Sequence, residues 1–145
     1  MDKGKVVNQV SLDNIDLEAV LKHQDKAFIN EDVVLIYNGN ILRSPLFHKE
    51  EIYQIAEPRI IFVMGGKGDT CINLQDYHLE QGYVVMTPPD TIFEINDVSP
   101  DARLVAIVFR DSIDMPEEII HKATPTEFDR LLRMFYLVWD IVQVS

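Results

Sequence analysis

Apolar and polar positions alternate along most of this chain, in short segments that are interrupted by turn residues. Between Ala27 and Phe109, runs rich in Val, Ile, Phe and Tyr are separated at close intervals by Gly, Pro, Asn and Asp. Runs of this kind, bounded by turn residues, predict short strands. The eight predicted strands are Asp32–Tyr37, Ile52–Ile55, Arg59–Met64, Thr70–Leu74, Tyr77–Leu79, Tyr83–Met86, Thr91–Ile95 and Arg103–Phe109. Because no long helices separate them, they predict a mainly β fold, either a sandwich, a jelly roll or a barrel.

Two short segments carry turn signals within this region. Asn38-Gly39-Asn40 predicts a tight turn, because Asn and Gly adopt positive φ at little cost. The segment from Gly65 to Asp69 predicts a second turn, which joins the run before it to Thr70–Leu74. It lacks the spacing and the following helix of a phosphate-binding loop, so we interpret it as a turn alone.

The N-terminal part of the chain has a different pattern. Residues 1–10 alternate only mildly and predict either an arm or a first edge strand. From Asn14 to about His23 the apolar residues fall partly at helical spacing, with Asp16 and Glu18 in the first turn, where they suit the helix dipole. We therefore expect a short helix here, which covers one end of the core.

The C-terminal part predicts helices. Residues Pro116–Lys122 predict a helical turn or short helix. Thr124-Pro125-Thr126-Glu127 then supplies a Thr N-cap, a Pro at the first helical position and a Glu three residues after the cap. No stop signal follows before Ser145, so we expect the native helix or chain to continue. The apolar residues of this helix, spaced by three and four, are Phe128, Leu131, Leu132, Phe135, Tyr136, Val138, Trp139 and Val142.

This apolar stripe is wide enough for two roles. Adjacent pairs such as Leu131-Leu132 and Val138-Trp139 cover more than one narrow seam, so we expect packing on the chain's own barrel as well as a dimer interface. The chain then divides into an arm with a short helix (1–26), a β-barrel (27–111) and a helical dimerisation segment (112–145).

Composition and charge limit the function. The chain has 145 residues, of which 47% are apolar, enough for one sizeable core. Its 24 acidic and 13 basic residues give a net charge of −11, and the basic residues are scattered among acids, so we expect no DNA binding by this chain alone.

The single cysteine, Cys71, allows no internal disulfide. Because neither a signal peptide nor a membrane span is recognisable, we expect a cytoplasmic protein without a membrane partner.

The segment from Gly82 to Asp97 resembles the second cupin motif. In that family the motif is Gly, five residues, Pro, one residue, Gly, two residues, His, three residues and Asn. Gly82 and Pro88 match by identity. Asp90 stands at the second Gly position, where a left-handed residue is needed and Asp is tolerated. Phe93 stands at the His position and cannot bind a metal.

The first cupin motif, which supplies two His and a Glu, also lacks its metal ligands here. Placing its final Gly on Gly66 puts the Glu position on Arg59. The two His positions then fall on Ile52 and Gln54, or on Tyr53 and Ile55. No register yields the converging carboxylate and imidazole groups that a divalent ion needs. We therefore expect no metal, no other cofactor and no catalytic residues.

The layout of the whole β region resembles the ligand-binding and dimerisation domain of AraC-family transcription regulators. The resemblance is carried by the order of a strand from Ile60 to Gly65, a segment from Tyr77 to Gly82, then Pro88, then Phe109-Arg110-Asp111, with helices after them. It implies a cupin-like barrel (a double-stranded β-helix or jelly roll) that binds a small-molecule effector, forms a homodimer through its C-terminal helices and is not an enzyme. DNA binding would belong to a further domain beyond Ser145.

Two alternatives stay open. One is a cupin-type, metal-dependent small-molecule enzyme, and the other is a structural dimerisation module with a filled barrel. If the barrel binds an effector, Arg59 at the cupin Glu position is expected to pair with a polar group of the ligand, although a surface Arg at a strand start fits the sequence equally well. Phe93 would turn inward together with its period-two neighbours, although core packing also explains it. The candidate ligand-binding residues are Tyr53, Arg59, Met86, Thr91, Phe93 and Ile95.

Overall fold

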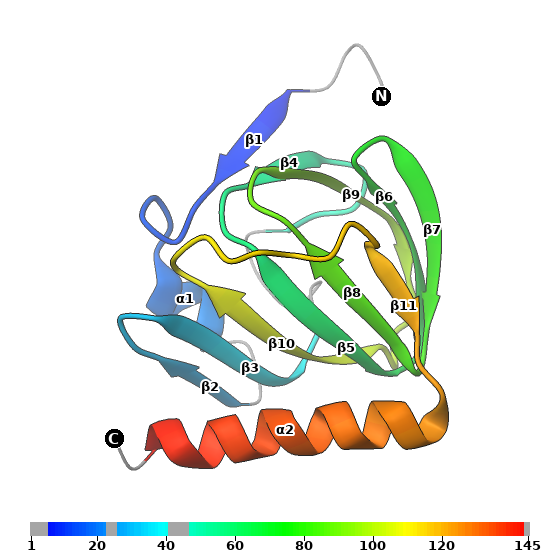
Figure 1. Cartoon of the computed structure of the whole chain (residues 1–145). Helices are drawn as coiled ribbons and strands as arrows, with labels where there is room; N and C mark the ends of the chain where they lie inside the picture. Colours follow the sequence, from blue (N-terminus) through cyan, green and yellow to red (C-terminus); the bar gives the residue numbers. More distant parts are fainter. Residues whose placement is uncertain (1–5, 23–25, 41–46, 144–145) are drawn as a thin grey trace.

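Two β-sheets and one long helix make up the computed structural model, which describes residues 6–22, 26–40 and 47–143 (Figure 1). The smaller sheet has the strand order β1-β4-β9-β6-β7 and the larger sheet the order β11-β8-β5-β10-β3-β2. The strands are β1 (Val7–Val10), β2 (Lys26–Ile29), β3 (Val33–Gly39), β4 (Ile52–Ile55), β5 (Arg59–Gly65), β6 (Lys67–Ile72), β7 (Gln75–Glu80), β8 (Tyr83–Thr87), β9 (Thr91–Val98), β10 (Arg103–Phe109) and β11 (Ile120–Lys122). The helices are α1 (Leu17–Leu21) and α2 (Pro125–Gln143).

The mainly β prediction is confirmed. Strands β4 and β10 have the predicted bounds, and the other six predicted strands differ by a few residues at their ends. Neighbouring strands pair in antiparallel fashion, apart from the parallel pair of β1 and β4. Of the two interpretations of residues 1–10, the edge strand therefore describes Val7–Val10.

The larger sheet buries apolar side chains on both of its faces. Its outer face packs against α2, which runs along this sheet in Figure 1. The centre of this core consists of Leu35, Phe62, Val84, Val105 and, from α2, Phe135. Because side chains alternate along a strand, the intervening residues of the same strands point toward the smaller sheet. The main core therefore lies between the larger sheet and α2, and a second apolar layer lies between the two sheets.

The predicted start of α2 is confirmed. Thr124 Oγ1 accepts a hydrogen bond from the Glu127 backbone N–H at 3.2 Å, and Pro125 is the first helical residue. The Glu127 carboxylate is bound to His121 Nε2 at 2.7 Å. This hydrogen bond is the main reason why the pKa of Glu127 is lowered, and the backbone N–H of Thr124 lowers it further. This hydrogen bond therefore attaches the first turn of α2 to strand β11.

The helical prediction for Pro116–Lys122 is wrong. Residues Ile120–Lys122 form strand β11, which pairs with Tyr83–Val85 of β8. An open edge of β8 provides backbone partners for this segment, and such tertiary pairing outweighs a weak local helical preference.

The tight turn predicted at Asn38-Gly39-Asn40 is also wrong. Strand β3 continues through Gly39, and its register against β10 shifts near this point, between Leu104 and Ala106. Asn38 does adopt the expected positive φ, of 54°, but within an irregular strand. The Asn and Gly residues thus mark a bulge, which uses the same conformational freedom as a turn.

Helix α1 is shorter than predicted. It begins at Leu17, with the Asp16 carboxylate accepting a hydrogen bond from the Ala19 N–H at 3.2 Å, and the predicted end at His23 lies outside the described residues. Leu17 packs against Val34 and Val108, so the helix covers one end of the space between the sheets, as expected. No helix in the described ranges is long and apolar enough to cross a membrane.

Candidate functional site

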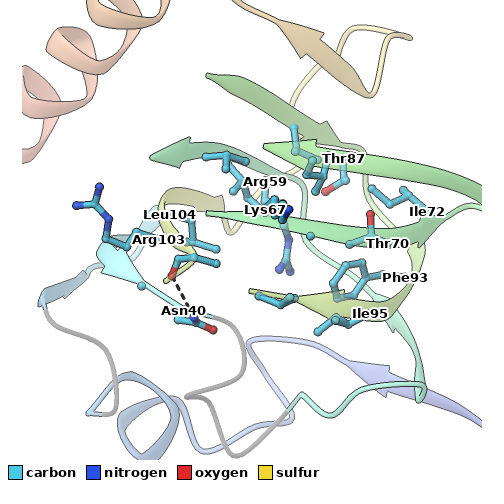
Figure 2. A pocket seen from close by; sticks show the side chains of 18 of the residues that line it. Asn40, Arg59, Lys67, Thr70, Ile72, Thr87, Phe93, Ile95, Arg103 and Leu104 are labelled. Carbon is cyan, nitrogen blue, oxygen red and sulfur yellow. Dashed lines mark hydrogen bonds between the residues drawn. The ribbon is translucent and has the colours of Figure 1, made fainter. Parts of the chain in front are cut away.

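A cavity of about 110 Å³ lies between the two sheets (Figure 2). Strands β5, β8 and β10 of the larger sheet and β4, β6 and β9 of the smaller sheet supply most of its wall. The wall is mainly apolar. Its apolar side chains include Ile55, Ile61, Val63, Ile72, Val85, Phe93, Ile95 and Leu104. An apolar wall with a few polar groups is typical of small-molecule sites.

Four of the six candidate ligand-binding residues line this cavity. Thr91, Phe93 and Ile95 face it from β9, at the alternate positions that period two requires. Arg59 faces it from the first position of β5. Figure 2 shows Arg59, Phe93 and Ile95 around the same space.

The other two candidates, Tyr53 and Met86, lie outside the cavity. Met86 packs against the core beneath α2, because β8 turns its neighbours Val85 and Thr87 toward the cavity instead. Tyr53 is buried beside Phe47, with ring centroids 4.9 Å apart. Its hydroxyl accepts a hydrogen bond from the His48 N–H at 2.7 Å and donates to Glu51 at 3.0 Å. Burial raises the pKa of Tyr53, so this phenol is a neutral packing group.

Arg59 is a half-buried charged residue whose side chain borders two cavities. It borders the cavity and also a second, smaller one of about 70 Å³ beneath the N-terminal segment. Its Nε atom is buried and has no hydrogen-bond partner among the described residues. Burial lowers the pKa of Arg59 to about 10, and the negative charge of Glu57 opposes that shift. The guanidinium therefore remains protonated at pH 7.

The buried carboxylate of Glu57 is already engaged elsewhere. It accepts hydrogen bonds from Ser11 Oγ at 2.9 Å and from the Leu12 N–H at 3.1 Å. These contacts attach the segment after β1 to the loop between β4 and β5. Glu57 therefore balances the charge of Arg59 from a distance, while its own hydrogen bonds go to the N-terminal segment.

The threonines in the cavity wall differ in their hydrogen bonds. Thr91 donates its hydroxyl to the Pro88 carbonyl at 2.7 Å. Thr70, which is only 6% exposed, has a buried Oγ1 atom with no partner among the described residues. Thr70 belongs to the smaller sheet and Arg59 to the larger, so each sheet brings one unpartnered polar group to the cavity. Buried polar groups are usually paired, so these two atoms leave hydrogen-bonding capacity in one wall.

The charges in the wall have one sign. Among the described residues that line the cavity, Arg59, Lys67 and Arg103 are basic and none is acidic. This contrasts with a chain in which acidic residues outnumber basic ones by 24 to 13. Lys67 and Arg103 are exposed, so they lie where the wall meets the solvent.

Several wall residues were not predicted from the sequence. Among them are Ile61, Val63, Thr70, Thr87 and Leu104. The period-two pattern of β5 does contain a signal, because Arg59 facing inward also turns Ile61 and Val63 inward. Thr70 carries no comparable signal, since an unpartnered hydroxyl becomes visible only when its surroundings are known.

The predicted dimer residues lie mostly against the chain's own sheet. Six of them, Phe128, Leu131, Leu132, Phe135, Trp139 and Val142, belong to the core between α2 and the larger sheet. Tyr136 and Val138 are partly exposed, at 36% and 38%. Three further apolar residues of α2, which the prediction did not include, are more exposed: Met134, Leu137 and Ile141, at 60%, 59% and 53%.

The part of the chain that the structure describes holds no group of three or more His, Cys, Asp or Glu side chains placed to bind a metal ion. Two of the described histidines contact carboxylates: His78 Nδ1 is bound to Asp69 at 2.8 Å, and His121 to Glu127.

Comparison with known proteins gives little further information. No protein-family model and no curated protein matches the chain. Among solved structures, it is similar to a protein from Pseudomonas aeruginosa described as glyoxylate-induced, with 13% sequence identity and a TM-score of 0.40. The match covers 68% of this chain and 52% of the other, so the chain spans about half the length of that protein. A similarity this low carries no argument about function.

Proposed function

We propose that this chain is a ligand-binding domain that holds a small molecule between its two sheets. The observation that carries the proposal is a mainly apolar cavity of about 110 Å³ whose wall contains two unpartnered polar groups, Arg59 Nε and Thr70 Oγ1. An empty cavity and an unpaired buried group each reduce stability. A bound molecule that fills the space and accepts these hydrogen bonds removes both costs.

We further infer that the two sheets form a cupin-like, jelly-roll barrel. The support comes from the backbone at the second cupin motif. Gly82 and Asp90, which occupy the two Gly positions of that motif, have φ values of 93° and 61°. Both residues thus adopt the left-handed conformation for which the motif keeps glycine. The presence of the cavity disfavours the alternative in which side chains fill the barrel.

In the wider proposal, the domain senses an effector for an AraC-type transcription regulator. The support is the sequence resemblance, together with a cavity in the expected part of the chain. DNA binding would then require a separate domain, because a chain of charge −11 repels phosphate. The effector would act by binding two arrangements of the regulator with different affinity, since equal affinity shifts no equilibrium.

Dimerisation belongs to the same proposal, through the exposed side of α2. Met134, Leu137, Val138 and Ile141 form an apolar stripe at spacings of three, one and three residues. Such a stripe is the pattern of a helix that packs against a second helix. We therefore place the homodimer interface on these residues, whereas the predicted stripe mainly serves the core.

The binding proposal is tested by screening small molecules against a variant whose cavity is filled. Val63→Phe adds an aromatic ring to the cavity wall and so reduces the space for a ligand. Ligand-observed NMR with a library of small organic acids, amides, alcohols, amines and sugars is expected to detect binding to the wild type, and loss of that binding in Val63→Phe. Circular dichroism confirms that the variant is folded. The proposal fails if no compound binds, or if the variant binds equally well.

Two further measurements separate the alternatives. Stoichiometric iron, manganese, nickel or zinc in purified protein would support the metal-dependent enzyme. The coding sequence after Ser145 tests the regulator, because two helix-turn-helix motifs within about a hundred residues are expected for it. A stop codon there would remove the AraC part of the proposal and leave the binding part unchanged.

A further inference from the structure

We infer that the ligand of this cavity is a small organic monoanion, with a carboxylate at Arg59 and an apolar body against the wall formed by Ile61, Val63, Phe93 and Ile95. The inference rests on the proposed ligand-binding function and specifies the chemical class of the ligand.

The sign of the charge follows from the wall. All three charged residues among its described members are basic, although nearly two thirds of the charged residues in the chain are acidic. Positive charge concentrated around an apolar space favours an anion and disfavours a cation. A neutral ligand would leave the buried charge of Arg59 without a direct partner, which is costly in an apolar surrounding.

The hydrogen bonds point to a carboxylate. Arg59 Nε is buried and free among the described residues, and an Nε–H with a neighbouring terminal N–H forms the fork with which arginine binds a carboxylate. The Glu57 carboxylate accepts hydrogen bonds from Ser11 and Leu12, and Arg59 Nε has no hydrogen bond to it. The hydroxyl of Thr70, equally free, supplies a second polar group in the same wall.

One negative charge fits better than two. Arg59 is the one basic residue of the described wall that is held in the interior, since Lys67 and Arg103 are exposed. A monoanion neutralises it, whereas a dianion brings a second charge into an apolar space. Size gives a further limit. An engineered cavity of about 150 Å³ holds benzene, so a cavity of about 110 Å³ suits an acid of about four to six carbon atoms.

The test compares molecules of one shape and different charge on the unmodified chain. Isothermal titration calorimetry measures the binding of pentanoate, pentanamide, 1-pentanol and the dianion glutarate. Pentanoate is expected to bind at least about tenfold more tightly than the other three. Equal or tighter binding of pentanamide or glutarate would overturn the inference while leaving the proposed binding function intact. If none of the probes binds and the wider library also fails, the proposed function itself is wrong.

Variants locate the anion. Arg59→Met is expected to remove the preference for pentanoate over pentanamide, and Arg59→Lys to retain part of it, because lysine keeps the charge and loses the fork. Thr70→Val is expected to weaken pentanoate binding by about threefold. Arg130→Met changes an exposed arginine on α2 in the same way and is expected to leave binding unchanged. A preference that persists in a folded Arg59→Met protein would overturn the inference, as would a loss of equal size in Arg130→Met.

Discussion

At the scale of single residues, Thr70 and Thr91 show how hydrogen bonding in the cavity wall affects stability. Both are buried in the cavity wall, at 6% and 3% exposure, but only the Thr91 hydroxyl has a hydrogen-bond acceptor among the described residues. A hydrogen bond contributes about 1 kcal/mol to stability, whereas an unpaired buried hydroxyl costs a similar amount. The same substitution is therefore expected to have opposite effects at the two positions.

Thr70→Val is expected to raise the free energy of unfolding of the unliganded protein by about 1 kcal/mol, and Thr91→Val to lower it by about 1 kcal/mol. Urea denaturation followed by circular dichroism measures both values. If Thr70→Val destabilises the protein as Thr91→Val does, the Thr70 hydroxyl is bonded in solution and cannot serve as a free group for a ligand.

His78 provides a second prediction at this scale. Its pKa is raised above 6.5, mainly by the hydrogen bond with Asp69 and to a smaller extent by Glu80. We expect NMR titration of the imidazole to show that Asp69→Asn lowers this pKa more than Glu80→Gln does. Because the pKa is raised in the folded state, the contact stabilises the fold fully below pH 6.5 and is lost as the pH rises through the folded value. Equal effects of the two variants would show that Asp69 is not the main partner.

At the scale of elements, sequence patterns predicted the strands because their determinants are local. The bounds of β4 and β10 follow from runs of apolar residues between turn residues, and the start of α2 follows from Thr124 and Pro125. Strand β11 depends instead on a partner, the edge of β8, which lies far away in the sequence. The Asn38 bulge likewise depends on the register of β3 against β10.

The residues of the candidate site were likewise predictable only where their determinants are local. Period-two alternation places Thr91, Phe93 and Ile95 together in the cavity wall, since they share one strand. The sequence does not show which face of β8 points toward the cavity, because the larger sheet has apolar residues on both faces, so the prediction of Met86 is wrong. The second face exists because α2 covers it. Alternation therefore gives the relative orientation of residues within a strand, whereas tertiary packing decides which set faces the cavity.

The turn between β6 and β7 holds a leucine in a strained backbone conformation. Its two turn residues, Asn73 and Leu74, have φ values of 49° and 68°, as in a type I′ turn. Asn tolerates this conformation, but a leucine in it costs about 1 to 2 kcal/mol. Leu74 is also 61% exposed, so its side chain contributes little burial.

We therefore expect Leu74→Gly to raise the free energy of unfolding by about 1 kcal/mol, because glycine adopts positive φ without a steric penalty. Thermal unfolding by calorimetry measures the change. Gly66→Ala is the opposite control: Gly66 has a φ of 73°, and an added Cβ would lie 2.4 Å from the Ala102 Cα. That variant is expected to lose stability. A loss of stability in Leu74→Gly would show that the leucine side chain has a packing role.

At the scale of the whole molecule, the cavity and the main core occupy opposite faces of the larger sheet. Phe135 of α2, only 2% exposed, anchors the core on the outer face, and Phe93 and Ile95 line the cavity on the inner side. The fold therefore has a packed layer beneath α2 in addition to the buried apolar residues between the two sheets. On the outer side of α2, Met134 and Leu137 are 60% and 59% exposed.

The proposed homodimer predicts pairs of opposite charges between the two chains as well as apolar contacts. If two α2 helices pack antiparallel about an axis near Leu137 and Val138, Met134 of one copy meets Ile141 of the other. Arg133 then lies on the same side of the helix pair as Asp140 of the other copy, offset by about 3 Å along the axis. Two such pairs form by symmetry. In the monomer Arg133 is bound to Asp129 at 3.0 Å, at an exposed position where such an ion pair is weak.

Sedimentation velocity is expected to show a dimer for the wild type and a shift toward monomer for Leu137→Glu. Arg133→Asp places two acidic residues opposite each other and is expected to weaken the dimer, as Asp140→Arg does by pairing two arginines. The double variant, Arg133→Asp with Asp140→Arg, restores opposite charges and is expected to recover dimerisation. A dimer that Leu137→Glu leaves unchanged, or double-variant behaviour equal to the sum of the single variants, would place the interface on another surface.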